Sequence, residues 1–506
     1  MSVVKRAPYP INEVSFCPID PARRGESWRR IQDQLKAFGH HLSDWAIRIL
    51  RDGLDEDLRC VVCEPYYVCK DHANLHSFFY SKKFVPQSNH SARLHFFNRL
   101  DIDKTTLVLR PLEYEQNYLG FSVIRPVAQR CIGRTVIDPL RIRRGAMKGF
   151  YALKTPFKVR IFGPEFSVAG FPYTSQDTDA MLCGHTALWS ICRYLSERYP
   201  KYRELLPYDL ISMTRKEAGR VVPHRGMGPE DYSAILSEFG THPIILGMKD
   251  RAKERELHGP SFRDLCAYVE SGVPLLASFQ GHAVTIIGHT LDWANRPVID
   301  EGWLIDHSCF FDSLVSNDDN RFPYVRLTRN PHPISETTSV STSNRTQRYF
   351  IEDLTAVVCP LPEKVFLTAA HARNVCLQAV KISRSKLEAL AGDGPFVTRL
   401  FFTNSAAFKR RRLETLKEKG PLAGVPFFIA QLHLPHFIWI MEIAPLRRYR
   451  EGFCCGEFVL DATAGRQDNA LIYSLVGNTI EYENAEESFP SSPLEYSQFT
   501  HNLGER

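Results

Sequence analysis

The sequence lacks the long apolar runs that mark membrane-spanning segments. No stretch reaches about 18 consecutive apolar residues, and residues 1–12 are polar and proline-containing where a secretory signal would be apolar. The net charge of +6 over 506 residues is too small to indicate a nucleic-acid partner. We therefore expect a soluble cytoplasmic protein with no membrane contact and no nucleic-acid ligand.

Common cofactor motifs are missing as well. The sequence contains no Walker A motif, no dinucleotide-binding glycine pattern and no HExxH zinc motif. We expect no cofactor and no catalytic metal. The thirteen cysteines are an odd number in a chain without an export signal, which favours free thiols over a disulfide framework.

What is present is the composition of a folded protein with more than one domain. Hydrophobic residues make up 44% and charged residues 24% of the chain. Its length exceeds that of one ordinary domain. We expect an α+β protein with an N-terminal domain over 1–160, a central domain over 161–365 with a polar loop at 330–347, and a C-terminal domain over 366–506. The two flanking domains are candidates for binding a partner protein.

Apolar periodicity predicts the main elements of the flanking domains. In the N-terminal domain we expect a helix over 27–54 and strands over 107–112 and 118–126. In the C-terminal domain we expect helices over 369–390 and 406–419, and strands over 427–434, 437–443 and 457–461. No internal repeat is evident.

Cys183 is the candidate nucleophile of the central domain. A polar stretch ends at Cys183-Gly184, and apolar residues then recur at helical spacing, which predicts a buried helix that begins at the cysteine. Unpaired N–H groups and the helix dipole favour a thiolate in that position. An isolated Cys-Gly is more often a structural cysteine, as we expect for Cys192 in the same helix.

His282 is the candidate base. The run VPLLASFQGHAVTIIGHT predicts a buried strand, a turn at Gln280-Gly281 and a second strand that opens with His282. A lone histidine in such a place is usually structural. A histidine at the mouth of a strand, with a helix-start cysteine about a hundred residues upstream, is what Cys-His catalysis requires.

The order of these motifs resembles the C39-like branch of the papain-fold cysteine peptidases. The resemblance covers about 165–330 and rests on the order of several segments. These are Gln176-Asp177, the CGHTAL helix start, a glycine-rich turn and helix over 225–240, a helix over 262–271, the Gly-Val-Pro-Leu-Leu strand and the strand beginning Gly281-His282. It implies a helix bearing the nucleophile packed on an antiparallel sheet bearing the base. It also implies that the Gln176 side chain and the Cys183 backbone N–H form an oxyanion hole.

The residue that orients His282 is open between two segments. The family places an Asp or Asn at the end of the strand that follows the histidine strand. Asp306 lies 24 residues after His282, whereas Asp318 and Asp319 follow the expected strand over 310–315. We favour Asp318, because that strand leads into a tight polar turn. A solvated turn or a cation site is the alternative interpretation of these residues.

Four residues with metal-ligand chemistry form a further candidate. Cys60, Cys63, Cys69 and His72 are residue types that bind zinc. Their surroundings alternate and are rich in β-branched and aromatic residues, which favours a strand over a zinc knuckle. Basic residues near 409–419 alternate with acidic ones and are typical of a solvated helix face.

Taken together, the residues predict a cysteine peptidase or isopeptidase that acts on a protein or peptide substrate. An amine-transfer enzyme or a deamidase would use the same Cys-His-Asp site, because water or an amine can resolve the same acyl-enzyme. A catalytically inactive papain-like binding module is the third alternative.

Overall fold

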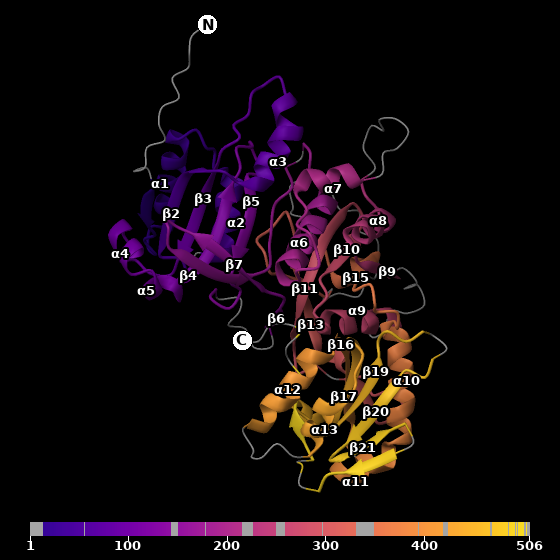
Figure 1. Ribbon diagram of the computed structural model, residues 1–506. Helices are drawn as coiled ribbons and strands as arrows, with labels where there is room; N and C mark the ends of the chain where they lie inside the picture. The colour runs from indigo at the N-terminus through magenta and orange to yellow at the C-terminus, as the bar shows by residue number, and fades with distance from the viewer. Residues whose placement is uncertain are drawn as a thin grey trace. The chain divides into compact units, whose positions relative to one another are not determined.

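The computed structural model describes residues 14–499 and 502, with gaps at 55, 143–149, 178, 215–225, 249–258, 296, 330–348, 393, 418–423, 466–467, 484, 491 and 493. It is a mixed α+β protein with several mostly antiparallel sheets (Figure 1). The polar loop expected at 330–347 lies outside the described residues. No helix in the described part is long and apolar enough to cross a membrane.

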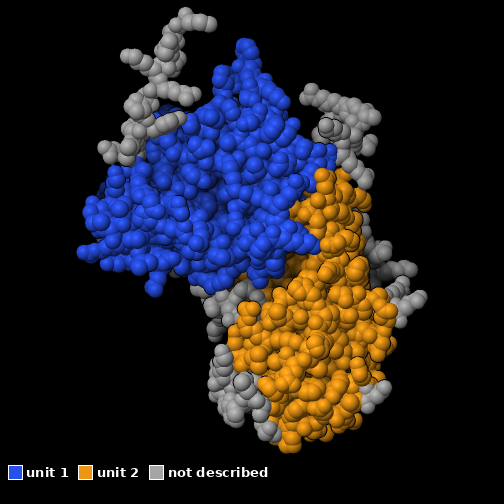
Figure 2. Space-filling model, in the orientation of Figure 1, with its two compact units in different colours: residues 1–147, 154–227, 317–325 blue, residues 148–153, 228–316, 326–506 orange. Residues whose placement is uncertain are grey.

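The chain forms two compact units (Figure 2). The first unit contains residues 1–147, 154–227 and 317–325, and the second contains 148–153, 228–316 and 326–506. The main division of the chain falls between residues 227 and 228, whereas boundaries were expected at about 160 and 365. Two short segments, 148–153 and 317–325, belong to the unit opposite to that of the residues on either side of them. The central region 161–365 is therefore divided between the units.

The first unit is built on a five-stranded antiparallel sheet in the order β1-β2-β3-β4-β5. Its strands are β1 (Ser15–Pro18), β2 (Cys60–Tyr67), β3 (Ser91–Phe97), β4 (Tyr118–Ile124) and β5 (Ile132–Ile137). The other elements are α1 (Arg24–Ala37), α2 (Asp44–Leu54), α3 (Lys70–Phe78), α4 (Lys104–Leu109), α5 (Leu112–Glu115), β7 (Thr155–Arg160), β8 (Glu165–Gly170), α6 (Cys183–Arg198) and α7 (Pro207–Met213). Strands β7 and β8 form a hairpin whose apolar side chains join the same core as those of the sheet.

The second unit contains the sheet that carries His282. Its strand order is β14-β13-β11-β10-β15-β9, and β6 also pairs with β11. The strands are β6 (Phe150–Ala152), β9 (His242–Gly247), β10 (Leu275–Phe279), β11 (His282–Leu291), β13 (Phe311–Asn317), β14 (Val325–Thr328) and β15 (Ala356–Leu361). Helices α8 (Pro229–Phe239) and α9 (Pro260–Glu270) belong to the same unit.

A second seven-stranded sheet follows in the same unit, in the order β12-β16-β17-β19-β20-β21-β22. Its strands are β12 (Leu304–Asp306), β16 (Phe396–Asn404), β17 (Phe437–Pro445), β19 (Gly456–Asp461), β20 (Leu471–Val476), β21 (Thr479–Tyr482) and β22 (Ala485–Ser488). The remaining elements are α10 (Ala369–Ile382), α11 (Arg384–Ala391), α12 (Ser405–Lys417), α13 (Val425–Gln431), α14 (Leu446–Arg450) and the short pair β18 (Phe453–Cys454) and β23 (Tyr496–Ser497).

Buried ion pairs cross the centre of this sheet. Glu442 and Glu457 are fully buried on β17 and β19, and Arg412 of α12 is within salt-bridge distance of both. Arg399 of β16 pairs with Glu442 and with Glu270 at the end of α9. Buried charges of this kind are tolerated only when each finds a partner. The C-terminal segment completes the network, because the backbone N–H of Phe499 donates to Glu442.

Several expected elements are confirmed and four are wrong. The helix expected over 369–390 is two helices, α10 and α11, which are separated at Ser383. The strand expected at 118–126 is β4, and the helix expected over 406–419 is α12. The expected helix over 27–54 is two helices, which end and restart around Gly39, a residue with φ of +79° that favours glycine. The apolar run expected as a strand at 107–112 instead spans the end of α4 and the start of α5, and Asp103 caps α4 by accepting from the Thr106 N–H. Residues 427–434 are mostly α13, which has a proline in its first turn.

Candidate active site

Cys183 is the first residue of α6, as the sequence predicted. The helix is almost wholly buried after this residue. All thirteen cysteines lie in the described part of the chain, and twelve of them are buried, whereas Cys183 is partly exposed. Burial raises the pKa of the Cys192 thiol in the same helix. Cys183 is thus the cysteine best placed to meet a reagent from solvent.

The loop before α6 is organised by Asp177, a residue to which sequence reasoning gave no role. One carboxylate oxygen accepts hydrogen bonds from the backbone N–H groups of Asp179, Ala180 and Met181, at 2.7 to 3.1 Å. The other accepts from the Tyr80 hydroxyl at 2.6 Å. The Asx pattern Asp177-x-Asp179 was the available signal for this turn. The carboxylate fixes the path of the chain into the helix.

Gln176, the candidate oxyanion donor, immediately precedes this turn. Its side chain is partly exposed. Its backbone carbonyl accepts a hydrogen bond at 3.4 Å from Arg125, which also binds the carbonyl of Ser175 at 2.9 Å. The backbone that carries Gln176 is therefore tied to the end of β4 within the same unit.

The first turn of α6 is closed by the two residues that follow Gly184. The Nδ1 atom of His185 accepts from the backbone N–H of Leu182 at 3.2 Å, so its Nε2 carries the proton and donates to Thr214 at 3.1 Å. Thr186 donates to the carbonyl of Cys183 at 2.7 Å. His185 is thereby used for capping, and its ring is a structural part of the helix start.

His282 opens β11 in the second unit, as the sequence predicted. Strands β10 and β11 are joined by Gln280 and Gly281, and Gly281 has a φ of +77° that such a two-residue turn requires. His282 is buried and lies opposite Phe279 across the hairpin. The ring of Tyr349 stacks on the imidazole, with centroids 5.3 Å apart and planes 19° apart.

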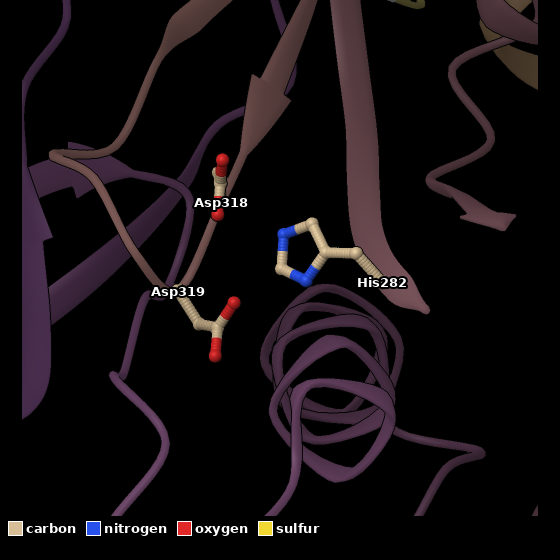
Figure 3. A group of neighbouring side chains, drawn as sticks. All are labelled: His282, Asp318 and Asp319. Atoms are coloured by element: carbon tan, nitrogen blue, oxygen red, sulfur yellow. The ribbon is translucent and has the colours of Figure 1, made fainter. Parts of the chain in front are cut away.

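Asp318 and Asp319 follow the end of β13, the neighbour of β11 in the sheet. The N–H of Asp292, just after β11, donates to the carbonyl of Phe310, just before β13. The two strands are therefore antiparallel, and the start of β11 lies beside the end of β13. One ligand atom each of His282, Asp318 and Asp319 lies within 4.8 Å of the other two, and Figure 3 shows the imidazole pointing toward the carboxylates.

The turn that carries the two aspartates is fixed by hydrogen bonds within the first unit. Asp318 accepts from the N–H of Asn320 at 3.0 Å, and the carbonyl of Asp319 accepts from the buried Tyr173 hydroxyl at 3.2 Å. Burial and the charges of Asp319 and Asp318 raise the pKa of Tyr173, which keeps its hydroxyl a donor. The Asn317 side chain donates to the carbonyl of Pro172 at 3.1 Å.

Tyr324 closes this turn and was not foreseen from the sequence. Its φ of +65° is rare for a residue with a Cβ. Its buried hydroxyl accepts from the N–H of Phe171 and donates to the carbonyl of Ile137, both at 2.8 Å. Its own N–H donates to the Asn317 side chain at 3.3 Å. Such a backbone conformation persists only where surrounding contacts hold it.

Asp306, the alternative partner for His282, lies in the other sheet of the second unit. It ends β12, which pairs in parallel with β16. Its carboxylate accepts from the N–H of Ser308 at 3.0 Å and lies 3.6 Å from Arg373. With Arg263 and Lys381 it lines a separate hollow of about 270 Å³. The structure brings His282 together with Asp318 and Asp319, and gives Asp306 different partners.

Among the described residues, one group of three or more histidine, cysteine or acidic side chains is close enough to hold a metal ion, and it is His282, Asp318 and Asp319. Cys60, Cys63, Cys69 and His72, which were weighed as zinc ligands against a strand, do not form such a group, and Cys60 and Cys63 lie in β2. Cys63 instead lies 4.0 Å from Cys17. His72 is hydrogen-bonded to the carbonyl of Ser88 at 2.9 Å.

Comparisons with known proteins add no relative. No protein-family model matches the chain. Searches of curated proteins and of solved structures also find no match. Any function assigned to the chain therefore rests on its own residues and their geometry.

Proposed function

We propose that this protein is a cysteine-nucleophile hydrolase that cleaves peptide or isopeptide amides by a papain-like mechanism. Cys183 is the nucleophile, His282 is the base, and Asp318 or Asp319 orients the imidazole. The observation that carries the proposal is that Cys183, at the start of a helix, is the one cysteine of thirteen that is not buried. It is supported by His282, which begins a strand and lies beside two carboxylates. A reducing compartment such as the cytoplasm would keep this thiol available.

The proposed reaction passes through a thioester. His282 takes the thiol proton, and the sulfur of Cys183 attacks the carbonyl carbon of the amide. The resulting oxyanion receives hydrogen bonds from the Cys183 N–H and the Gln176 side chain. The C–N bond breaks as His282 returns the proton to the amine. A water molecule, deprotonated by His282, hydrolyses the thioester and restores the thiol.

The carboxylate supports this reaction by binding the second imidazole nitrogen. In that position it holds one tautomer and stabilises the imidazolium that forms when the thiol is deprotonated. The same set of side chains would also serve an amine-transfer enzyme or a deamidase, because only the group that resolves the thioester differs.

The test is alkylation of the protein with iodoacetamide at neutral pH, followed by peptide mass spectrometry. We expect Cys183 to react before the twelve buried cysteines, which act as internal references. His282→Ala should slow the alkylation of Cys183 by about tenfold or more, because the thiolate loses its imidazolium partner. Equal alkylation rates in the parent protein and the His282→Ala variant would reject the assignment and favour the inactive binding module.

Divalent-metal binding is a second candidate function, favoured by the proximity of His282, Asp318 and Asp319. One imidazole nitrogen and two carboxylate oxygens are ligand types that suit transition metals. Titration calorimetry with Mn²⁺ or Zn²⁺ separates the two functions. A metal-dependent enzyme would bind the ion through His282. It would lose its activity when the metal is chelated, but its Cys183→Ala variant would remain active. The cysteine hydrolase would show the reverse pattern.

A further inference from the structure

The ring of Tyr349 covers the two residues that face each other at the end of the β10–β11 hairpin. Tyr349 stacks on His282 with centroids 5.3 Å apart, and packs at a tilt of 35° against Phe279 with centroids 4.7 Å apart. Phe279 and His282 are directly paired across the strands, so their side chains leave the same face of the sheet. All three residues belong to the second unit.

The position of Tyr349 is fixed by the residues that follow it. The backbone N–H of Phe350 donates to the Asp353 side chain at 2.8 Å, which caps a short 3-10 helix over Ile351–Asp353. Ile351 and Leu354 are buried in the core of the unit. The chain then enters β15, which pairs with β10. The tyrosine is therefore held over the hairpin by an anchored segment.

We propose that Tyr349 is a positioning residue that sets the plane of the His282 imidazole. The torsion that rotates an imidazole about its Cβ–Cγ bond is broad, so the ring plane of a histidine is not set by its own rotamer. A second aromatic ring at stacking distance restricts that rotation. The inference rests on the proposed function, because it assigns the restriction a role in proton transfer.

The role follows from the geometry that proton transfer demands. The imidazole must keep one nitrogen toward the carboxylates and the other toward the thiol, at about 2.6–3.2 Å in the reacting complex. A displacement of about 1 Å can reduce a rate by about a hundredfold. Rotation of the ring would misplace both nitrogens at once, so the flat contact with Tyr349 has a direct consequence for catalysis.

The experiment compares Tyr349→Phe, which keeps the stacked ring, with Tyr349→Met, which replaces it by a flexible apolar side chain without a ring. We expect Tyr349→Phe to alkylate Cys183 with iodoacetamide at close to the parent rate. Tyr349→Met should be slower by about tenfold or more. Tyr349→Leu serves as the second non-aromatic variant if Tyr349→Met does not fold.

Nuclear magnetic resonance gives a readout that does not depend on reactivity. The stacked ring should shift the carbon-bound protons of the His282 imidazole upfield in the parent and in Tyr349→Phe, and this shift should be lost in Tyr349→Met. Tyr151→Leu is the matched control. Tyr151 packs at a tilt of 32° against His289, near the other end of β11, with centroids 5.2 Å apart. Loss of the Tyr151 ring should therefore leave Cys183 alkylation unchanged.

The outcomes separate the positioning role of Tyr349 from the proposed function. If Tyr349→Met reacts at the parent rate while His282→Ala is slow, the positioning role is overturned and the hydrolase assignment stands. The positioning role is also overturned if Tyr349→Phe is as slow as Tyr349→Met, because the hydroxyl and not the ring face would then matter. If His282→Ala itself reacts at the parent rate, the proposed function fails and the inference fails with it.

Discussion

Phe279 and His282 are cross-strand partners at the closed end of the β10–β11 hairpin, and only two residues separate them in the chain. This pairing places the histidine at the first position of β11, beside the end of β13 and its two aspartates. A turn one residue longer would move the imidazole to the other face of the sheet. The short turn is thus the local feature on which the candidate base depends.

Replacement of the carboxylates should identify the partner of His282. One of the two variants Asp318→Asn and Asp319→Asn removes the carboxylate that orients His282. We expect that variant to hydrolyse its substrate about 10²–10⁴-fold more slowly, the usual contribution of acid–base catalysis. Asp306→Asn should leave hydrolysis nearly unchanged, because Asp306 contacts Ser308 and Arg373. Turnover of a peptide substrate found by screening is the measurement. A large loss in Asp306→Asn alone would contradict the assignment, and no loss in any variant would leave a Cys-His dyad.

Gln176→Ala should separate oxyanion stabilisation from activation of the thiol. Alkylation by iodoacetamide forms no oxyanion, so the alkylation rate of Cys183 should stay at the parent value. Hydrolysis of an amide should fall by about 10²–10³-fold, as expected for loss of one oxyanion donor. Gln280→Ala, on the β10–β11 turn, controls for a general effect of removing a glutamine side chain. Parallel losses of alkylation and hydrolysis in Gln176→Ala would indicate a structural role for this residue.

Tyr324→Phe should destabilise the first unit. The change removes a buried hydroxyl and leaves the N–H of Phe171 and the carbonyl of Ile137 without that partner. A buried polar group left unsatisfied costs about 1–3 kcal/mol. Chemical denaturation should therefore show a lower free energy of unfolding, by about that amount. An unchanged denaturation midpoint would mean that these hydroxyl bonds do not hold the turn.

Glu64 should give the first unit a pH-dependent stability. Burial alone would raise the pKa of Glu64, but the hydrogen bond and charge of His95 and the charge of Arg93 lower the pKa to about 2. Arg93 pairs with the same carboxylate at 2.6 Å. The ionised carboxylate is favoured in the folded state. Its stabilisation is therefore complete above about pH 4.5 and is lost as the pH falls toward 2.

The measurement is the free energy of unfolding of the parent protein and of Glu64→Gln between pH 2 and 6. The parent should lose stability relative to the variant by up to about 3 kcal/mol as the pH falls through this window. A constant difference between the two proteins would contradict the pKa assigned to this carboxyl group.

The sequence predicted the local features of the candidate site better than its long-range contacts. The change from polar to apolar residues at Cys183 predicted the start of α6, and Gln280-Gly281 predicted the turn before His282. The predictions failed where a short apolar run was taken for a strand and a cap at its start was overlooked, as at Asp103, which caps α4 before Leu107. The contacts of Tyr324 with Ile137 and of Tyr349 with His282 join distant parts of the chain, and no periodicity reports such pairs.

The central claim is that Cys183 and His282 act together on one substrate. The most direct measurement is an experimental structure of the full chain with its cysteines unmodified. It gives the distance from the Cys183 sulfur to the nearer ring nitrogen of His282. We predict a distance within about 4 Å, a loose hydrogen bond of the kind seen before substrate binds. A structure that places the two side chains on opposite sides of the protein would contradict it.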